Sequence, residues 1–231
     1  MKLRTEKDTM GSIDVPENAY YGAQTQRAVK NFPVSGLTLP SPFIQALALI
    51  KKYAALVNAD LQLLDSKKAR AIAQAAQEVL DEKFDDQFVV DVFQTGSGTS
   101  THMNMNEVLS SRANEILTGQ KASKSPVHPN DHVNLGQSSN DVISSALHIA
   151  ASLSIKNDLL PSLEHLYQSL SEKSIRFDDV KKLGRTHLQD AVPMSLGQEF
   201  SGYASQIARG INRMETARLG LAELALGGTA I

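Results

Sequence analysis

The fold is indicated first by residues 195–221, which read SLGQEFSGYASQIARGINRMETARLGL. Apolar side chains recur there at three- and four-residue steps, which places them on one face of an α-helix. Residues 140–170 repeat this period and are interrupted by Pro161, where we expect a bend. Helices of roughly 30 residues have more than twice the usual length and are typical of long bundles that pack across subunits. The two stretches therefore predict an all-α protein that forms oligomers, with the apolar stripes in its core.

Three shorter helices are expected upstream of the long ones. Their predicted starts are Ser41, Ser66 and about Met103. At the first of these, the serine is expected to cap the helix and Pro42 to occupy its first position. The third helix is expected to end at Gly119 in a left-handed cap.

The segment before these helices has a different character. Residues 1 to 40 are rich in glycine and proline and lack the helical period, so an irregular leading segment with room for short strands is expected. The chain is then expected to form an amino-terminal helical domain, residues 1–136. The first long helices of a central bundle follow in residues 137–231.

Composition restricts the classes of function. The 231 residues carry a formal net charge of -2 without a block of Lys and Arg, so a nucleic-acid partner is not expected. The absence of cysteine excludes disulfides, thiolate metal sites and thiol nucleophiles. The first residues lack a signal-peptide pattern and no stretch is apolar for long enough to span a bilayer, so a cytoplasmic protein without membrane contact is expected.

The first polar cluster, TGSGTST at residues 95–101, directly precedes a predicted helix. It matches neither a phosphate-binding P-loop nor the dinucleotide fingerprint, because Thr101 replaces the third glycine. Its hydroxyl groups, its glycines and the positive end of the helix dipole all favour an anion. An ordinary helix-capping loop would produce the same pattern, so both interpretations stay open.

The second polar cluster, QSSND at residues 137–141, opens the first long helix and follows VHPNDHVN at residues 127–134. Its serines and Asn140 are also typical helix caps. His128 and His132 stand four residues apart, a spacing that suggests zinc, but Pro129 interrupts a helix and a third ligand is missing. We therefore expect no metal.

The third polar cluster is GRTHLQD at residues 184–190, ahead of the second long helix. His187 beside the Thr186 hydroxyl could transfer protons near neutral pH, although a lone histidine is more often structural. Because each cluster precedes a predicted helix, the three helix starts could converge on one small dianion. A phosphate-rich ligand fits less well, since Arg185 is the only cation within the clusters.

Taken together, the three clusters resemble the first motifs of the fumarase/aspartase superfamily. The matching strings are GSGTSTHMNMNE at 96–107, VHPNDHVN at 127–134, QSSND at 137–141 and GRTHLQD at 184–190. Their order and spacing match, and the resemblance covers essentially the whole chain. Ser138-Ser139-Asn140 and Thr186-His187 are similar to class II fumarases, whereas aspartate ammonia-lyases tend to have Ser-Thr-Asn and often a glutamine in place of that histidine.

The resemblance implies an L-aspartase/fumarase-like fold and the reversible hydration of fumarate to (S)-malate, by anti addition through an aci-carboxylate. It implies that His187 performs acid/base catalysis through a water molecule. The residues it implies for binding the substrate carboxylates are Ser97, Gly98, Thr99, Ser138, Ser139, Asn140 and Thr186. A second, non-catalytic anion site would comprise His128, Pro129, Asn130 and Asp131. No metal or organic cofactor is implied, and the intact family forms homotetramers whose active sites combine three subunits.

Several departures from the family pattern leave alternatives open. His102 replaces the usual asparagine, Leu135 replaces a lysine, and residues 143–145 differ as well. The chain stops at Ile231, before the family loop with the general-base serine and a substrate-binding lysine. We therefore expect a truncated, inactive and self-associating fragment. The alternatives are an aspartate ammonia-lyase or another lyase of the superfamily, and a non-catalytic dicarboxylate-binding or assembly module.

Overall fold

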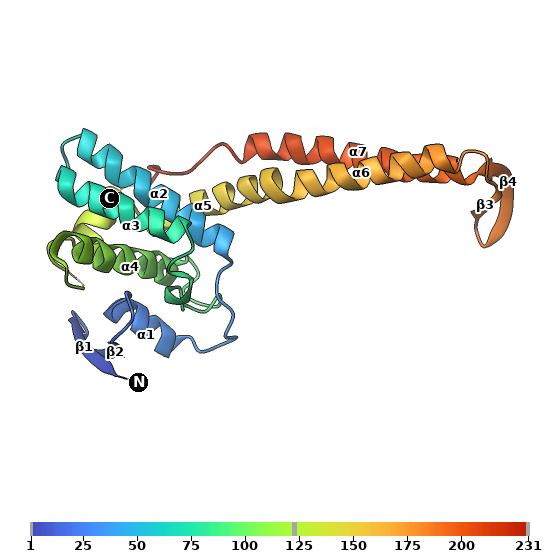
Figure 1. Cartoon of the computed structure of the whole chain (residues 1–231). Coiled ribbons are helices and arrows are strands. Elements are labelled where there is room, and N and C mark those ends of the chain that lie inside the picture. The colour runs from blue at the N-terminus through green and yellow to red at the C-terminus, as the bar shows by residue number, and fades with distance from the viewer. Residues whose placement is uncertain (1, 122–123, 230–231) are drawn as a thin grey trace. The chain divides into compact units, whose positions relative to one another are not determined.

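The computed structural model describes residues 2–121 and 124–229 (Figure 1). These residues form two compact units. Of the described residues, those up to Ala150 and those from Leu224 onward form the first unit, and Ala151–Glu223 form the second. The domain boundary expected after residue 136 stays a prediction for the intact protein. The mainly helical class predicted from the periodic stretches is confirmed.

The first unit starts with an antiparallel hairpin and continues as helices. Its elements are β1 (Leu3–Asp8), β2 (Gly11–Pro16), α1 (Ala23–Asn31), α2 (Ser41–Asp60), α3 (Ser66–Leu80), η1 (Asp85–Gln87), α4 (Thr99–Thr118), η2 (Pro129–Val133) and the start of α5 (Ser139–Ser154). Arg4 anchors the hairpin by donating hydrogen bonds to the carbonyl oxygens of Pro16, Ala19 and Tyr21. The leading segment is thus more regular than its glycines and prolines suggested.

The second unit contains the end of α5, a π-helical turn η3 (Ile155–Leu159), α6 (Leu160–Arg176), β3 (Lys181–Thr186), β4 (Gln189–Ser195) and α7 (Leu196–Gly220). Helices α6 and α7 run side by side, and the β3–β4 hairpin connects their far ends (Figure 1). The expected interruption at Pro161 takes the form of the π-helical turn just before it. Ser195 begins α7 with a capping box, in which its hydroxyl accepts from the Gln198 N–H.

Two expected helix starts are wrong by a few residues. Ser41 is the first helical residue of α2 rather than its cap, because Pro40 occupies the cap position. Helix α4 begins at Thr99 instead of Met103, because the left-handed Gly98 turns the chain directly into the helix. The starts near Ser66 and Ser195 and the left-handed cap at Gly119 are confirmed.

The core of the first unit lies between α2, α3, α4 and the start of α5. Fully buried apolar side chains include Leu47, Ile72, Met105, Leu109 and Val142. Within the second unit, by contrast, α6 has no buried residue and α7 buries only Gly197 and Ala204. The paired helices therefore leave much apolar surface exposed, which is consistent with the expected self-association.

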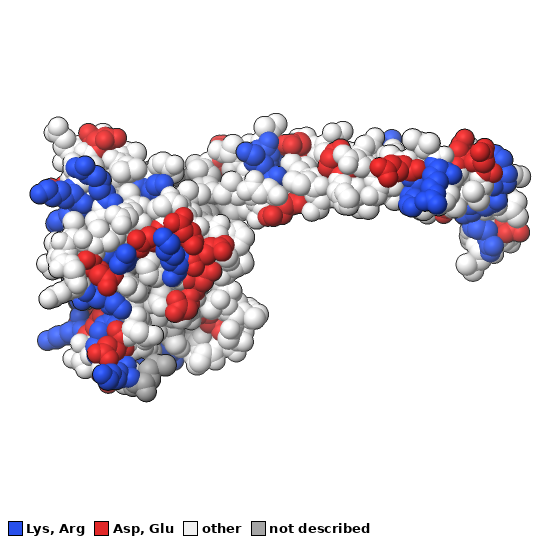
Figure 2. Space-filling view, viewed as in Figure 1, with Lys and Arg blue, Asp and Glu red and all other residues white. Residues whose placement is uncertain are grey.

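Charged groups and hydropathy agree with the composition. On the face seen in Figure 2, the Lys and Arg side chains lie among Asp and Glu, without a continuous basic stripe. Among the described residues, no helix combines the length and the apolar character needed to cross a membrane.

Asp91 fastens the loop after α1 to the loop before α4, and we expect this contact to make stability pH-dependent. Its carboxylate accepts from the N–H groups of Ser35, Gly36 and Phe93 at 2.7–2.8 Å. These bonds, that of Phe93 first, lower the pKa of Asp91 to about 2, although burial opposes them. The unfolded value is about 3.9, so the stabilisation is complete above that value and is lost as the pH falls from about 4 to about 2.

Asp91→Asn should therefore be less stable than wild type at neutral pH, with a difference that shrinks as the pH falls to about 2. Urea denaturation across this pH range measures the difference. Asp60→Asn, at the exposed end of α2, serves as the control and should show little difference at any pH. A difference between Asp91→Asn and wild type that does not change with pH would contradict this role.

Candidate functional site

The first polar cluster forms a tight turn at the start of α4. The Ser97 and Thr99 hydroxyl groups lie 2.8 Å apart. Gly98 has a positive φ of 70°, and a Cβ atom there would lie 3.1 Å from the side chain of Ile143 on α5. Glycine is thus required both by the backbone conformation and by the close approach of α5. This contact sets the start of α4 against the first turns of α5.

The second polar cluster forms the start of α5. Asp141 Oδ1 accepts from the Ser138 N–H at 3.0 Å, and Asp141 Oδ2 accepts from the Gly227 N–H at 2.9 Å. Ser139 is half-buried, and its Oγ lies 2.8 Å from Nδ1 of His102 on α4. The first two polar clusters are therefore neighbours, joined by a side-chain hydrogen bond between α4 and α5.

A buried lysine lies behind these two clusters. Lys51 on α2 is fully buried, and its Nζ lies 2.6 Å from His102 Nε2, 2.8 Å from Gln137 Oε1 and 3.1 Å from Asn134 Oδ1. Burial lowers the pKa of Lys51 well below its usual value, and the charge of Asp141 opposes that shift. Burial, and then the charge of Lys51, lower the pKa of His102 to about 2, so the imidazole is neutral.

The helical period of α2 places a lysine at a buried apolar position, and this sequence signal could have identified Lys51 as part of a polar site. Lys51 follows Phe43 and Leu47 at four-residue steps, on the apolar face of α2. A lysine at such a position is rarely buried without polar partners, so it indicates a buried polar site. The partners come from α4 and from the segment before α5, which are distant in sequence.

The residues of the expected second anion site form a cap at η2. His128 Nδ1 accepts from the N–H groups of Asn130 and Asp131, each at 3.3 Å. His132 Nδ1 accepts from the His128 N–H at 2.8 Å, and Lys68 Nζ lies 3.0 Å from His132 Nε2. The two imidazole rings thus accept from different backbone N–H groups, and Lys68 is a cation that sequence spacing did not reveal here. No group of three His, Asp or Glu among the described residues could hold a metal ion.

The third polar cluster is not at a helix start, so this expectation was wrong. Thr186 ends β3, His187 and Leu188 form a two-residue turn with φ of 51° and 61°, and Gln189 begins β4. Two positive φ values identify a type I′ turn, which usually contains asparagine and glycine, so His-Leu carried no signal for it. His187 and Thr186 are exposed at this tip and belong to the second unit, whereas the other candidate residues belong to the first.

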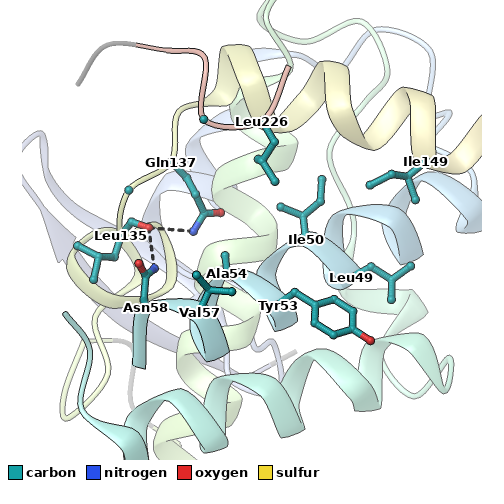
Figure 3. Close-up of a pocket in the computed structure, with 12 residues that line it drawn as sticks. Leu49, Ile50, Tyr53, Ala54, Val57, Asn58, Leu135, Gln137, Ile149 and Leu226 are labelled. Atoms are coloured by element: carbon teal, nitrogen blue, oxygen red, sulfur yellow. Dashed lines mark hydrogen bonds between the residues drawn. The ribbon is translucent and has the colours of Figure 1, made fainter. Parts of the chain in front are cut away.

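An apolar pocket lies next to Gln137, one of the partners of Lys51 (Figure 3). It has a volume of about 490 Å³ and is lined mainly by aliphatic side chains of α2, by Tyr53 and by Leu226. Leu135, at a position where the family pattern has a lysine, also lines this pocket. A pocket so poor in polar groups does not suit a dianion. The polar starts of α4 and α5 are therefore the better candidate for an anion site.

Comparisons with known proteins agree with the motif strings. A family model described as lyase matches residues 11–231. Class II fumarate hydratases from Halobacterium salinarum and Nitrosomonas europaea are 55% and 57% identical over 99% and 100% of this chain, which covers 48% and 50% of them. The chain thus spans about half the length of the curated relatives it matches.

Solved structures show the same relation. The crystal structure of a class II fumarase from Schistosoma mansoni matches with a TM-score of 0.96 and 46% identity, over 100% of this chain and 48% of that one. A fumarate lyase:delta crystallin from Brucella melitensis matches with a TM-score of 0.94 and 43% identity, over 98% of this chain and 53% of that one. The chain therefore belongs to the lyase family, and it resembles the amino-terminal part of class II fumarases.

Proposed function

We propose that this chain provides part of a fumarate hydratase, which adds water reversibly to fumarate to give (S)-malate. The main supporting observation is the 2.8 Å contact between His102 and Ser139, because it joins the starts of α4 and α5 in one polar site. Helix starts carry unpaired N–H groups and a positive dipole end, which together favour carboxylates. The identity of 50–57% to class II fumarate hydratases supports the same reaction.

In this proposal the two helix starts bind the carboxylates of the substrate. The residues involved are Ser97, Gly98, Thr99, Ser138, Ser139 and Asn140. Donors at these positions stabilise the aci-carboxylate dianion that forms when a proton leaves the carbon next to a carboxylate. Such stabilisation uses hydrogen bonds and fixed dipoles only, and the proposal assigns no step to a metal.

Thr186 and His187 complete the proposed site from the β3–β4 hairpin. His187 would transfer a proton to or from the departing oxygen through a water molecule. The positive φ of His187 and Leu188 supports a functional tip, since non-glycine residues in this conformation cost about 1–2 kcal/mol each and such strain clusters at functional sites. We propose that the hairpin works in a homo-oligomer, where subunits share each active site.

The assay that tests this function offers malate and aspartate separately to the protein. Both the 231-residue chain and the product of any longer reading frame containing it are tested. In the longer protein, fumarate, followed by its ultraviolet absorbance, should form from malate and not from aspartate. Ammonia release from aspartate would replace the proposal with an ammonia-lyase, and dicarboxylate binding without turnover in either protein would favour a binding module.

A further inference from the structure

The amide groups next to Lys51 can only accept hydrogen bonds from it. Gln137 Nε2 donates to the carbonyl oxygens of Val133 at 3.1 Å and Leu135 at 3.2 Å, the second of which is drawn in Figure 3. Asn134 Nδ2 donates to the Gln137 carbonyl oxygen at 3.2 Å. Because both amide nitrogens are occupied, both amide oxygens face Lys51 Nζ. The third partner of Lys51 Nζ is His102 Nε2, whose role as donor or acceptor depends on the tautomer of the imidazole.

A charged Lys51 leaves the Ser139 hydroxyl free to donate. An ammonium group has three N–H donors, which match the two amide oxygens and His102 Nε2. Since Nε2 then accepts, the proton of the neutral imidazole lies on Nδ1 and is donated to Ser139 Oγ. The hydroxyl hydrogen of Ser139 remains available for another acceptor.

A neutral Lys51 reverses the direction of this chain. Its two N–H groups serve the two amide oxygens, and its lone pair accepts from His102 Nε2–H. Nδ1 then accepts the hydroxyl hydrogen of Ser139, which is no longer available elsewhere. Each arrangement gives Lys51, His102 and both amide oxygens their partners, and they differ only in whether the hydroxyl hydrogen of the half-buried Ser139 lies inside the network.

We propose that Lys51 and His102 act as positioning residues that set the direction in which the Ser139 hydroxyl donates. A carboxylate bound at Ser139 requires the outward direction, and hence a proton on Lys51. Anion binding is therefore coupled to the uptake of one proton at Lys51. This coupling rests on the proposed function, whereas the two directions of the network do not.

The groups that face Lys51 act on its two states in opposite directions. Burial favours the neutral amine, whereas the Asp141 carboxylate at the start of α5 favours the ammonium. On α4, His102 stays neutral in both states. On α3, which packs against α2, the Lys68 amine lies next to His132. A carboxylate arriving at Ser139 adds negative charge and shifts the balance towards the ammonium.

The test follows the His102 tautomer by ¹⁵N NMR of histidine-labelled protein between about pH 5 and about pH 10. His102 should change from the Nδ1–H to the Nε2–H form as the pH rises, and it should stay neutral throughout. His165, exposed on α6, provides the reference imidazole. A single tautomer over the whole range, or conversion of His102 to imidazolium, would overturn the proposal.

Two variants and one ligand distinguish a failure of the Lys51–His102–Ser139 network from a failure of the proposed function. Lys51→Met should abolish the pH-dependent change, whereas Lys52→Met, on the same helix and bonded to Gln77, should retain it. Above the midpoint, fumarate should restore the Nδ1–H form, take up one proton, and bind up to tenfold more weakly per pH unit. If the pH change occurs but fumarate does not bind, the two directions of the hydrogen-bond network stand and the proposed function fails. If fumarate binds without changing the His102 tautomer, the proposed coupling between Ser139 and Lys51 is wrong.

Discussion

Glu107→Ala is expected to destabilise the first unit by about 3–5 kcal/mol, because the Glu107 carboxylate holds the start of α1. Glu107 is buried on α4. Its Oε2 accepts from the N–H groups of Gly22 and Thr25 and from the Thr25 hydroxyl, at 2.6–3.1 Å, and its Oε1 accepts from the Gln24 N–H at 3.0 Å. Burial raises the pKa of Glu107, and these four donors oppose the rise. Alanine would leave all four donors without this partner.

Urea denaturation at neutral pH measures this loss. Glu107→Gln should cost less than the alanine variant, because its amide oxygen can still accept the three bonds made to Oε2 while its NH₂ group opposes the Gln24 N–H. Glu17→Ala, on the exposed loop after β2, serves as the control and should change the free energy of unfolding by no more than about 0.5 kcal/mol. If Glu107→Ala were as stable as this control, the anchoring of α1 through Glu107 would be refuted.

His187→Asn is expected to lower fumarate hydration by about 10² to 10⁴-fold, the usual contribution of a general acid or base. Asparagine is well suited to this comparison because it tolerates the positive φ of the turn and cannot transfer a proton near neutral pH. The loss should appear mainly in kcat, since the carboxylates are proposed to bind at the starts of α4 and α5. The assay requires a protein that turns over malate before mutation.

The matched control is His165→Asn, which makes the same chemical change on the exposed face of α6. Its turnover should stay within about twofold of wild type, as is usual for a surface substitution. Circular dichroism should show equal helix content in both variants. A His187→Asn enzyme with the turnover of this control would remove His187 from the proposed mechanism.

The sequence by itself determined most of the helices and the family. The three- and four-residue spacing of apolar side chains reflects hydrogen bonds four residues apart, so α2, α3 and α7 could be predicted from local patterns. Gly119 was predictable for the same local reason, because few other residues adopt its conformation. The strings at residues 96–107 and 184–190 identified the lyase family from their residues alone. No spatial distance between the two segments was needed for this.

Only the tertiary structure decided which polar groups meet. Lys51 contacts Gln137, and Glu107 contacts Gly22, across more than 80 residues of sequence. The hairpin at His187 depends on pairing between β3 and β4 and not on any turn signal. The physical reason is that helical hydrogen bonds are local, whereas the cost of burying a polar group is offset by partners whose position depends on the packing of distant elements.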